Sequence, residues 1–363
     1  MALSCGIVGL PNVGKSTIFN ALTRSAQALA ANYPFATIEP NVGEVPLPDA
    51  RLKVLAKLVA SDRIVYATTR FVDIAGLIRG ASSGAGLGNA FLSHIRECDA
   101  IAMVLRAFED ADVPLDDGID PIRDAEIVNV EMALADLATL AKRIEKLERE
   151  ARTNPKLAPT LAAAGRLRAA LENGTPARAL FGDDEAAALA RESFLLTIKP
   201  VLYVANIDES QIGNLGPAAR AVAEMADRER TRSVAFCGKV EAELAGMSED
   251  EAAAFGAELG IERSALESLI HGAYELLGLM TFLTAGEKEV RAWPIARGTK
   301  APQAAGKIHS DIERGFIRAE IVAYDDYARL RTMEALRAAG LMRSEGKEYV
   351  MQEGDVVNFR FNV

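Results

Sequence analysis

The chain contains little cysteine or histidine, and it has no long uninterrupted hydrophobic run. Its 363 residues include three histidines and three widely separated cysteines, Cys5, Cys98 and Cys237. This distribution fits neither a disulfide framework nor a zinc cluster, and it favours a reducing compartment. No apolar run reaches the ~18 residues of a membrane helix, and the first predicted strand follows the N-terminus too closely for a targeting peptide. We therefore expect a cytoplasmic protein without a membrane partner.

The chain also lacks an excess of positive charge. Its formal net charge is −10 at pH 7, with half of the residues hydrophobic and a quarter charged. This acidic balance argues against the whole molecule as a polyanion binder, so DNA is not expected and any RNA contact needs a local basic patch. The length is sufficient for a large core in two or three domains.

A phosphate-binding motif is the strongest signal in the sequence. Gly9–Thr17 reads GLPNVGKST and contains G-x-x-x-x-G-K-[ST], between a predicted strand, Leu3–Val8, and a segment with helical spacing. In such a loop, backbone N–H groups converge on phosphate, the lysine reaches the β- and γ-phosphates, and the serine hydroxyl holds Mg²⁺. We expect Lys15 to be catalytic, together with Gly76 further along the chain. The predicted phosphate-binding residues are Asn12, Val13, Gly14, Lys15, Ser16 and Thr17.

A second motif, D-x-x-G, follows another apolar strand. Here it runs from Asp73 to Gly76, and we expect Asp73 to approach Mg²⁺ through water while the Gly76 N–H senses the γ-phosphate. Between the two motifs lies a polar loop with prolines, residues 32–41, in which Thr37 is the predicted second Mg²⁺ ligand. Taken alone, each signal also describes an ordinary turn. Their order after a P-loop favours the functional interpretation.

The residue after this glycine bears on hydrolysis. Ras-type switches carry a glutamine there to orient the attacking water, whereas this chain has Leu77. Hydrolysis is therefore slow, or the water is placed by backbone, Mg²⁺ or another group. The next segment, Gly80–Gly88, has four glycines in nine positions, and we expect bound nucleotide to order it. His94 beyond it is more often the polar face of a helix than a site residue.

The expected base-reading segment departs from the guanine-specific pattern N-K-x-D. After the predicted strand Pro200–Asn206, the chain reads Asn206-Ile207-Asp208-Glu209, so isoleucine replaces the lysine and a longer carboxylate replaces the aspartate. A carboxylate placed for guanine N1–H is wrong for adenine, and mispaired buried polar groups are costly. We therefore predict adenine over guanine. The predicted base-site residues are Asn206, Ile207, Glu209, Cys237, Gly238 and Lys239, the last three in a loop that closes over the base.

The chain predicts three domains. Residues 1–125 and 200–279 alternate short apolar runs with helical segments, as in a Ras-like α/β P-loop domain with a mostly parallel sheet. Between them, residues 126–199 carry two heptad-like seams separated by Pro155, which predicts an inserted helical hairpin. From 280 to 363 short strands, including Phe316–Tyr324 and Val356–Val363, predict a separate α+β domain.

Together these segments resemble the YchF proteins, the Obg-like ATPase family of P-loop NTPases. The resemblance runs nearly end to end, and includes GLPNVGKSTIFNALT from Gly9, NYPFATIEPNVG from Asn32, FVDIAGLIRGAS from Phe71 and APQAAGKIHSDIERGFIRAE from Ala301. It implies a cytoplasmic, Mg²⁺-dependent ATPase that prefers ATP to GTP and binds the large ribosomal subunit or the whole ribosome. It also implies a C-terminal β-grasp (TGS) domain, and K⁺ is a candidate activator. Relatives commonly carry a histidine in the loop at 108–118; this chain does not, so no role is transferred to it.

One segment of the hairpin is basic. Residues 141–170 hold eight basic residues and only three acidic ones, so we expect contact with ribosomal RNA phosphates there, although a solvated helix face is the commoner case. The basic residues are Lys142, Arg143, Lys146, Arg149, Arg152, Lys156, Arg166 and Arg168. Lys288, Arg291, Lys307, Arg314 and Arg318 are a second candidate surface. An Obg-class GTPase and a nucleotide-gated binding module without turnover stay as alternatives.

Overall fold

The structure, a computed structural model, describes residues 3–30, 38–39, 41–74, 87–109, 118–244, 246–247, 249–261 and 264–362. The chain packs into two compact units. Unit 1 comprises Met1–Ala28, Thr37–Glu44 and Arg70–Leu277, and unit 2 comprises Leu29–Ala36, Val45–Thr69 and Gly278–Val363. The three cysteines are buried free thiols. No helix in the described ranges is both long and apolar enough to cross a membrane.

A seven-stranded sheet forms the centre of unit 1. Its order is β2-β3-β5-β1-β6-β7-β8, with β1 parallel to β5 and β6, and β7 parallel to β6 and β8. The strands are β1 (Ser4–Val8), β2 (Ile38–Glu39), β3 (Val42–Pro46), β5 (Thr68–Asp73), β6 (Ala100–Ala107), β7 (Val201–Ile207) and β8 (Ser233–Phe236). The predicted strands Leu3–Val8 and Pro200–Asn206 are confirmed as β1 and β7. Central parallel strands are covered on both faces, so they read as continuous apolar runs that are easy to locate.

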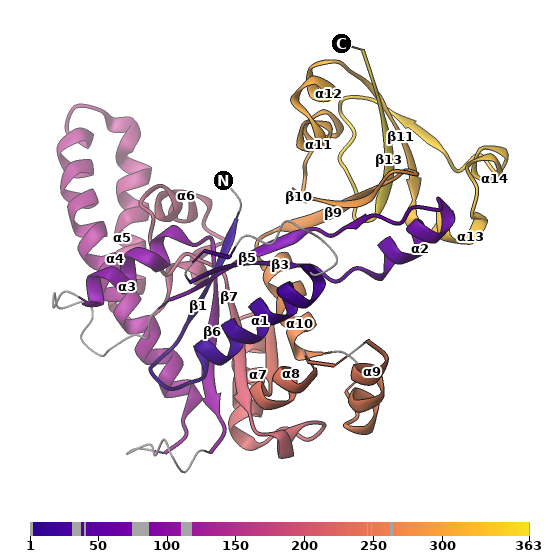
Figure 1. Cartoon of the computed structure of the whole chain (residues 1–363). Coiled ribbons are helices and arrows are strands. Elements are labelled where there is room, and N and C mark those ends of the chain that lie inside the picture. Colours follow the sequence, from indigo (N-terminus) through magenta and orange to yellow (C-terminus); the bar gives the residue numbers. More distant parts are fainter. Residues whose placement is uncertain are drawn as a thin grey trace. The chain divides into compact units, whose positions relative to one another are not determined.

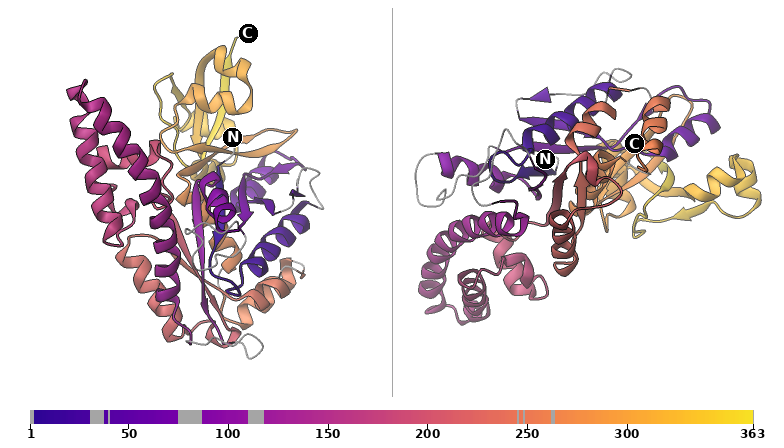
Figure 2. Two further views of the ribbon diagram at one scale, coloured as in Figure 1. Left: turned by 90° about the vertical axis from the view of Figure 1, so that its left-hand side faces the viewer. Right: turned by 90° about the horizontal axis from the view of Figure 1, so that it is seen from below.

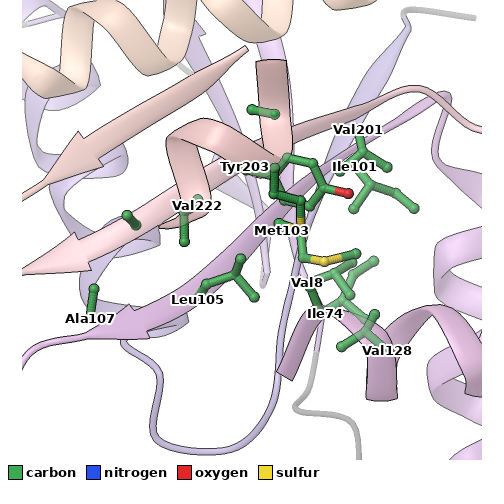
Figure 3. Close-up of a cluster of buried hydrophobic side chains, with 14 of the residues drawn as sticks. Val8, Ile74, Ile101, Met103, Leu105, Ala107, Val128, Val201, Tyr203 and Val222 are labelled. Atoms are coloured by element: carbon green, nitrogen blue, oxygen red, sulfur yellow. The ribbon is translucent and has the colours of Figure 1, made fainter. Parts of the chain in front are cut away.

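Helices cover both faces of this sheet (Figure 1). The helices of unit 1 are α1 (Lys15–Ala30), α3 (Leu87–Glu97), α4 (Pro121–Ala151), α5 (Ala158–Glu172), α6 (Asp184–Glu192), α7 (Pro217–Arg228), α8 (Gly238–Leu244), α9 (Glu249–Glu258) and α10 (Ala265–Leu276). On one face α3, α4 and α7 bury a core around Met103, Tyr203 and Val128 (Figure 3). On the other face lies α10, whose Gly272 packs closely on Leu202 of β7. The predicted α/β P-loop fold is confirmed.

The predicted helical hairpin is present as α4 and α5, which run side by side (Figures 1 and 2). Asp120 caps the start of α4 by accepting a hydrogen bond from the Arg123 N–H, and Pro155 opens a short 3-10 turn that reverses the chain. Leu140, Leu147 and Leu167 lie in a separate small core between the helices. The same α4 begins on the sheet and ends in the hairpin, so one continuous helix connects the two.

A buried carboxylate closes the base of this hairpin. Asp136 of α4 is fully buried and accepts hydrogen bonds from the N–H of Leu196 at 2.7 Å and the N–H of Thr197 at 2.8 Å. It also accepts one at 2.7 Å from the Thr197 hydroxyl, which in turn accepts from the Ala177 N–H. The return of the chain from the hairpin to β7 is therefore held by one side chain of α4.

Asp136→Ala is expected to lower the free energy of unfolding by about 3 kcal/mol, because it leaves two buried N–H groups and a hydroxyl without their acceptor. Urea unfolding followed by circular dichroism measures this loss. Glu126→Ala, an exposed change on the same helix, is the matched control and should change stability by less than about 0.5 kcal/mol. Equal stabilities of the two variants would contradict the anchoring role.

Unit 2 is built on a six-stranded sheet of order β12-β11-β13-β9-β10-β4. Its strands are β4 (Ile64–Val65), β9 (Leu279–Ala285), β10 (Val290–Ala296), β11 (Phe316–Ala323), β12 (Arg343–Glu345) and β13 (Asp355–Phe361). Its helices are α2 (Ala50–Leu58), α11 (Ala301–Ile308), α12 (Ser310–Arg314), α13 (Tyr324–Leu330) and α14 (Met333–Ala338). Helix α11 packs its alanines against Phe282 and Phe359 of the sheet.

Residues 45–69 group with this C-terminal unit. Strand β4 pairs parallel with β10, Ile64 opposite Val290, and Arg51 of α2 forms ion pairs with Asp49 and Glu353, each at 2.7 Å. The sequence pattern had placed this segment with the nucleotide-binding domain. The predicted domain limits, and the assignment of residues 280–363 to a TGS domain, stay predictions.

Candidate functional site

The P-loop lies at the carboxyl end of β1, between that strand and α1. Gly14 has φ +97°, and a Cβ atom there would lie 2.1 Å from the Asn206 Nδ2 atom. A Cβ atom on Gly9 would lie 2.4 Å from the Val104 carbonyl oxygen. Asn12 also takes the left-handed conformation, with φ 62°. The loop is therefore wrapped so closely over β6 and β7 that both motif glycines are sterically required.

Lys15, Ser16 and Asp73 are brought together beside this loop. Asp73 ends β5, which pairs with β1, so the two predicted motifs lie on adjacent strands. Lys15 is 8% exposed, and its Nζ donates a hydrogen bond to the Leu10 carbonyl at 2.6 Å. Burial lowers the pKa of Lys15, and the nearby Asp73 carboxylate opposes that shift. Burial also raises the pKa of Asp73, while attraction to Lys15 and a hydrogen bond from the Ser16 hydroxyl lower it.

This donor set fits Mg²⁺. Magnesium prefers oxygen ligands and is usually held by one or two protein groups together with substrate phosphates and water. The Ser16 hydroxyl and the Asp73 carboxylate supply such oxygens side by side, next to the phosphate-binding loop. In the described ranges, no three His, Cys, Asp or Glu residues cluster as a ready-made metal site. The predicted ligand Thr37, and Gly76 with its neighbour Leu77, lie outside the described residues.

The predicted base-reading residues follow β7. Asn206 is buried, and its Nδ2 donates to the Val13 carbonyl at 3.0 Å, which ties the end of β7 to the P-loop. Its Oδ1 is then the atom suited to accept from an exocyclic amine. Ile207 is buried and Glu209 is exposed. The sequence had indicated base contact for Asn206 but gave no signal for its bond to the P-loop.

Of the predicted closing loop, only Cys237 lies between β8 and α8, because Gly238 and Lys239 are the first residues of α8. A Cβ atom on Gly238 would lie 2.8 Å from the Thr17 Cγ2 atom, so this loop contacts the P-loop helix directly. Burial raises the pKa of Cys237, its neighbouring backbone N–H groups lower it, and Glu209 raises it further, which places Cys237 near that carboxylate. Lys239 is exposed. A cavity of about 390 Å³ borders both Ile207 and Cys237. The structure therefore gathers the predicted nucleotide residues that it describes at one sheet edge; their roles stay predictions.

Of the eight basic residues predicted in the hairpin, four are paired with acids, three lie near the tip, and Lys142 lies exposed further back on α4. The pairs are Arg143 with Glu192, Lys146 with Glu150, Arg166 with Asp183 and Arg168 with Glu172. In the described part of the chain, Arg149, Arg152 and Lys156 near the tip are exposed and form no ion pair. They form the hairpin tip patch.

The second candidate surface is largely neutralised, because Arg291, Arg314 and Arg318 pair with Glu289, Asp311 and Glu320. His94 lies exposed on α3, as its helical spacing indicated.

Comparison with known proteins agrees with this geometry. A family model described as "50S ribosome-binding GTPase" matches residues 4–151, and the YchF-GTPase C-terminal model, described as a protein of unknown function, matches residues 279–362. The chain is 49% identical to the ribosome-binding ATPase YchF of Bacillus subtilis and 48% identical to that of Haemophilus ducreyi, over the full length of each. The solved YchF GTPase of Schizosaccharomyces pombe superimposes with a TM-score of 0.88 at 38% identity, covering 99% of this chain and 97% of that one.

Proposed function

The chain belongs to the YchF family, and from this premise we propose that it is a ribosome-associated ATPase that prefers ATP to GTP and couples an Mg²⁺-dependent nucleotide cycle to ribosome binding. The observation that carries the proposal is the single sheet edge that holds Lys15, Ser16 and Asp73 at one end and Asn206 at the other. Such an edge can hold a triphosphate and a purine at once.

The chemistry follows from these side chains. Lys15 exchanges its bond to the Leu10 carbonyl for the phosphates, where a buried ammonium stabilises the charge that develops as the γ-phosphate leaves. Ser16, and Asp73 through water, would hold Mg²⁺, which would supply positive charge to neutralise the phosphates when bound. The Asn206 Oδ1 accepts the adenine amine, and at the next position Ile207 replaces the lysine of the guanine-specific pattern. No glutamine stands after the D-x-x-G motif to orient water, so the intrinsic turnover is expected to be slow.

Competition of unlabelled ATP and GTP for one fluorescent nucleotide tests the base preference. We expect ATP to compete better. The double change Ile207→Lys and Glu209→Asp restores the guanine-type N-K-x-D pattern, and we expect it to shift the ATP-to-GTP preference toward GTP by about tenfold, the effect of one satisfied or mispaired buried group. Asp208 is unchanged, so the strand end keeps its contact with the Glu109 N–H.

A clear GTP preference of the wild-type chain would instead identify an Obg-class GTPase. Turnover that stays negligible with ribosomes and K⁺ present, despite tight ATP binding, would favour a nucleotide-gated binding module.

For the ribosome, the proposed contacts are the hairpin tip patch and a TGS-type C-terminal domain. Positive side chains without acid partners can neutralise RNA phosphates. The counterions that the RNA then releases are the main source of affinity. The match of residues 4–151 to the ribosome-binding GTPase model and the names of the relatives support ribosome binding. The large subunit or the whole ribosome is the proposed partner, and K⁺ the proposed activator.

A further inference from the structure

Arg106 lies at the carboxyl end of β6, beside the proposed base-reading end of β7. In the parallel register Arg106 is opposite Asn206, and Ala107 is opposite Ile207. Paired residues of neighbouring strands project to the same face of a sheet, so Arg106 shares the face of Asn206. Leu105 and Ala107 project to the opposite face, into the core of Figure 3. Arg106 is only 3% exposed.

The contacts of this guanidinium are incomplete. Its Nε donates to the Phe108 carbonyl at 3.1 Å, and its central carbon lies 4.6 Å from the centre of the Phe108 ring. Its Nη1 is buried and has no hydrogen-bond partner within the described residues. An unpaired buried donor on a charged group is costly, and such groups concentrate at functional sites. A buried arginine with an unpaired donor at this position therefore lowers the stability of the fold compared with an apolar side chain.

The segment that follows Arg106, residues 107–109, is hydrogen-bonded to residues 208–211, which follow Asn206 and Ile207. The Gln211 side chain donates to the Ala107 carbonyl at 2.9 Å, and the Glu109 N–H donates to the Asp208 carboxylate at 3.2 Å. Gln211 is itself held by the Gly216 N–H at 3.0 Å. The two strand ends, residues 107–109 and 208–211, are therefore joined on both sides of Phe108.

We propose that Arg106 is a positioning residue for the nucleoside half of the nucleotide site. Its hydrogen bond and ring contact hold Phe108 and the end of β6 in place. The two hydrogen bonds between the strand ends then hold the segment that follows Asn206 and Ile207 in place. Arg106 acts through these neighbours and leaves the phosphate half, around Lys15 and Asp73, unchanged. The proposal rests on the proposed nucleotide-binding function.

The test compares two ligands of the full-length protein by titration calorimetry with Mg²⁺ present: ATP, and inorganic tripolyphosphate, which lacks the nucleoside. We expect Arg106→Met to weaken ATP binding about tenfold and to change tripolyphosphate binding less than about twofold. Arg106→Lys keeps the charge but loses the planar fork, so it should lie between the wild type and Arg106→Met. The exposed Arg228→Met on α7 is the matched control and should bind both ligands normally.

Steady-state turnover gives a second readout, in which Arg106→Met should raise KM for ATP about tenfold and leave kcat unchanged. A wild-type chain that does not bind ATP would refute the proposed function itself. If the wild-type chain binds ATP and Arg106→Met has the same ATP affinity and the same KM, the proposed role of Arg106 is wrong. An equal loss of ATP and tripolyphosphate affinity, or a fall in kcat alone, would overturn it as well, since either result locates the effect at the phosphates or in the fold.

Discussion

Lys15→Met is expected to weaken ATP binding about 100-fold or more, to a level that titration calorimetry no longer detects. Lys15 is the cation of the P-loop, and a charge-assisted bond to phosphate contributes about 1.5–3 kcal/mol, with each 1.4 kcal/mol equal to a factor of ten. The effect should reach the upper end of that range, because Lys15 is only 8% exposed and water competes little for its ammonium group. Methionine keeps most of the side-chain volume, so the loop should keep its shape.

Two controls separate this effect from unfolding. The circular dichroism spectrum and the melting temperature of Lys15→Met should match those of the wild type, since burial already disfavours the charged form of this side chain. Lys142→Met, an exposed change on α4, should bind ATP normally. Wild-type affinity in Lys15→Met would refute the assignment of the phosphate site, whatever the role of the residues around Asn206.

Reversing the charge of the hairpin tip patch is expected to abolish ribosome co-sedimentation at physiological salt while ATP turnover without ribosomes is kept. The change is Arg149→Glu, Arg152→Glu and Lys156→Glu together. Each cation removed from a phosphate should reduce the steepness of log affinity against log salt by about 0.7–0.9, so the three changes together should reduce it by about 2–3. Co-sedimentation over a salt series measures both the affinity and this salt dependence.

A matched triple variant uses basic residues of the same hairpin that already have acid partners. Lys146→Glu, Arg166→Glu and Arg168→Glu changes the net charge equally, but its targets pair with Glu150, Asp183 and Glu172. If the tip patch binds the ribosome, this variant should retain more binding than the tip variant. Equal weakening would mean that overall charge matters rather than the tip, and unchanged co-sedimentation of the tip variant would refute the hairpin contact.

The sequence was most informative where the physical signal is local. The strands around the P-loop, such as β1 and β6, are short and apolar throughout because helices cover both faces of a parallel sheet. The hairpin helices were predicted because an apolar residue every three or four positions marks the buried seam, and Pro155 marks the turn. The phosphate loop is likewise a contiguous motif with its own strand and helix.

Interactions between distant segments were not predictable in this way. Asp136 reads as one polar residue in an amphipathic helix, yet it holds Leu196 and Thr197, sixty residues away, in place. Residues 45–69 follow the α/β alternation of unit 1, yet β4 pairs with β10 more than 200 positions later. Such pairings depend on which surfaces meet after the chain has folded, and nothing in the local pattern encodes the partner.

The sequence alone therefore determined the family, the P-loop fold with its inserted hairpin, and the residue types at the proposed site, because each of these is written in contiguous motifs or a regular apolar period. Only the tertiary structure decided how those residues act on one another. It tied Asn206 to the Val13 carbonyl, placed Lys15 beside Asp73, and buried Arg106 with an unpaired donor next to the base-reading strand. The reason is that hydrogen bonding and burial at a sheet edge depend on strands brought together from residues 4 to 236.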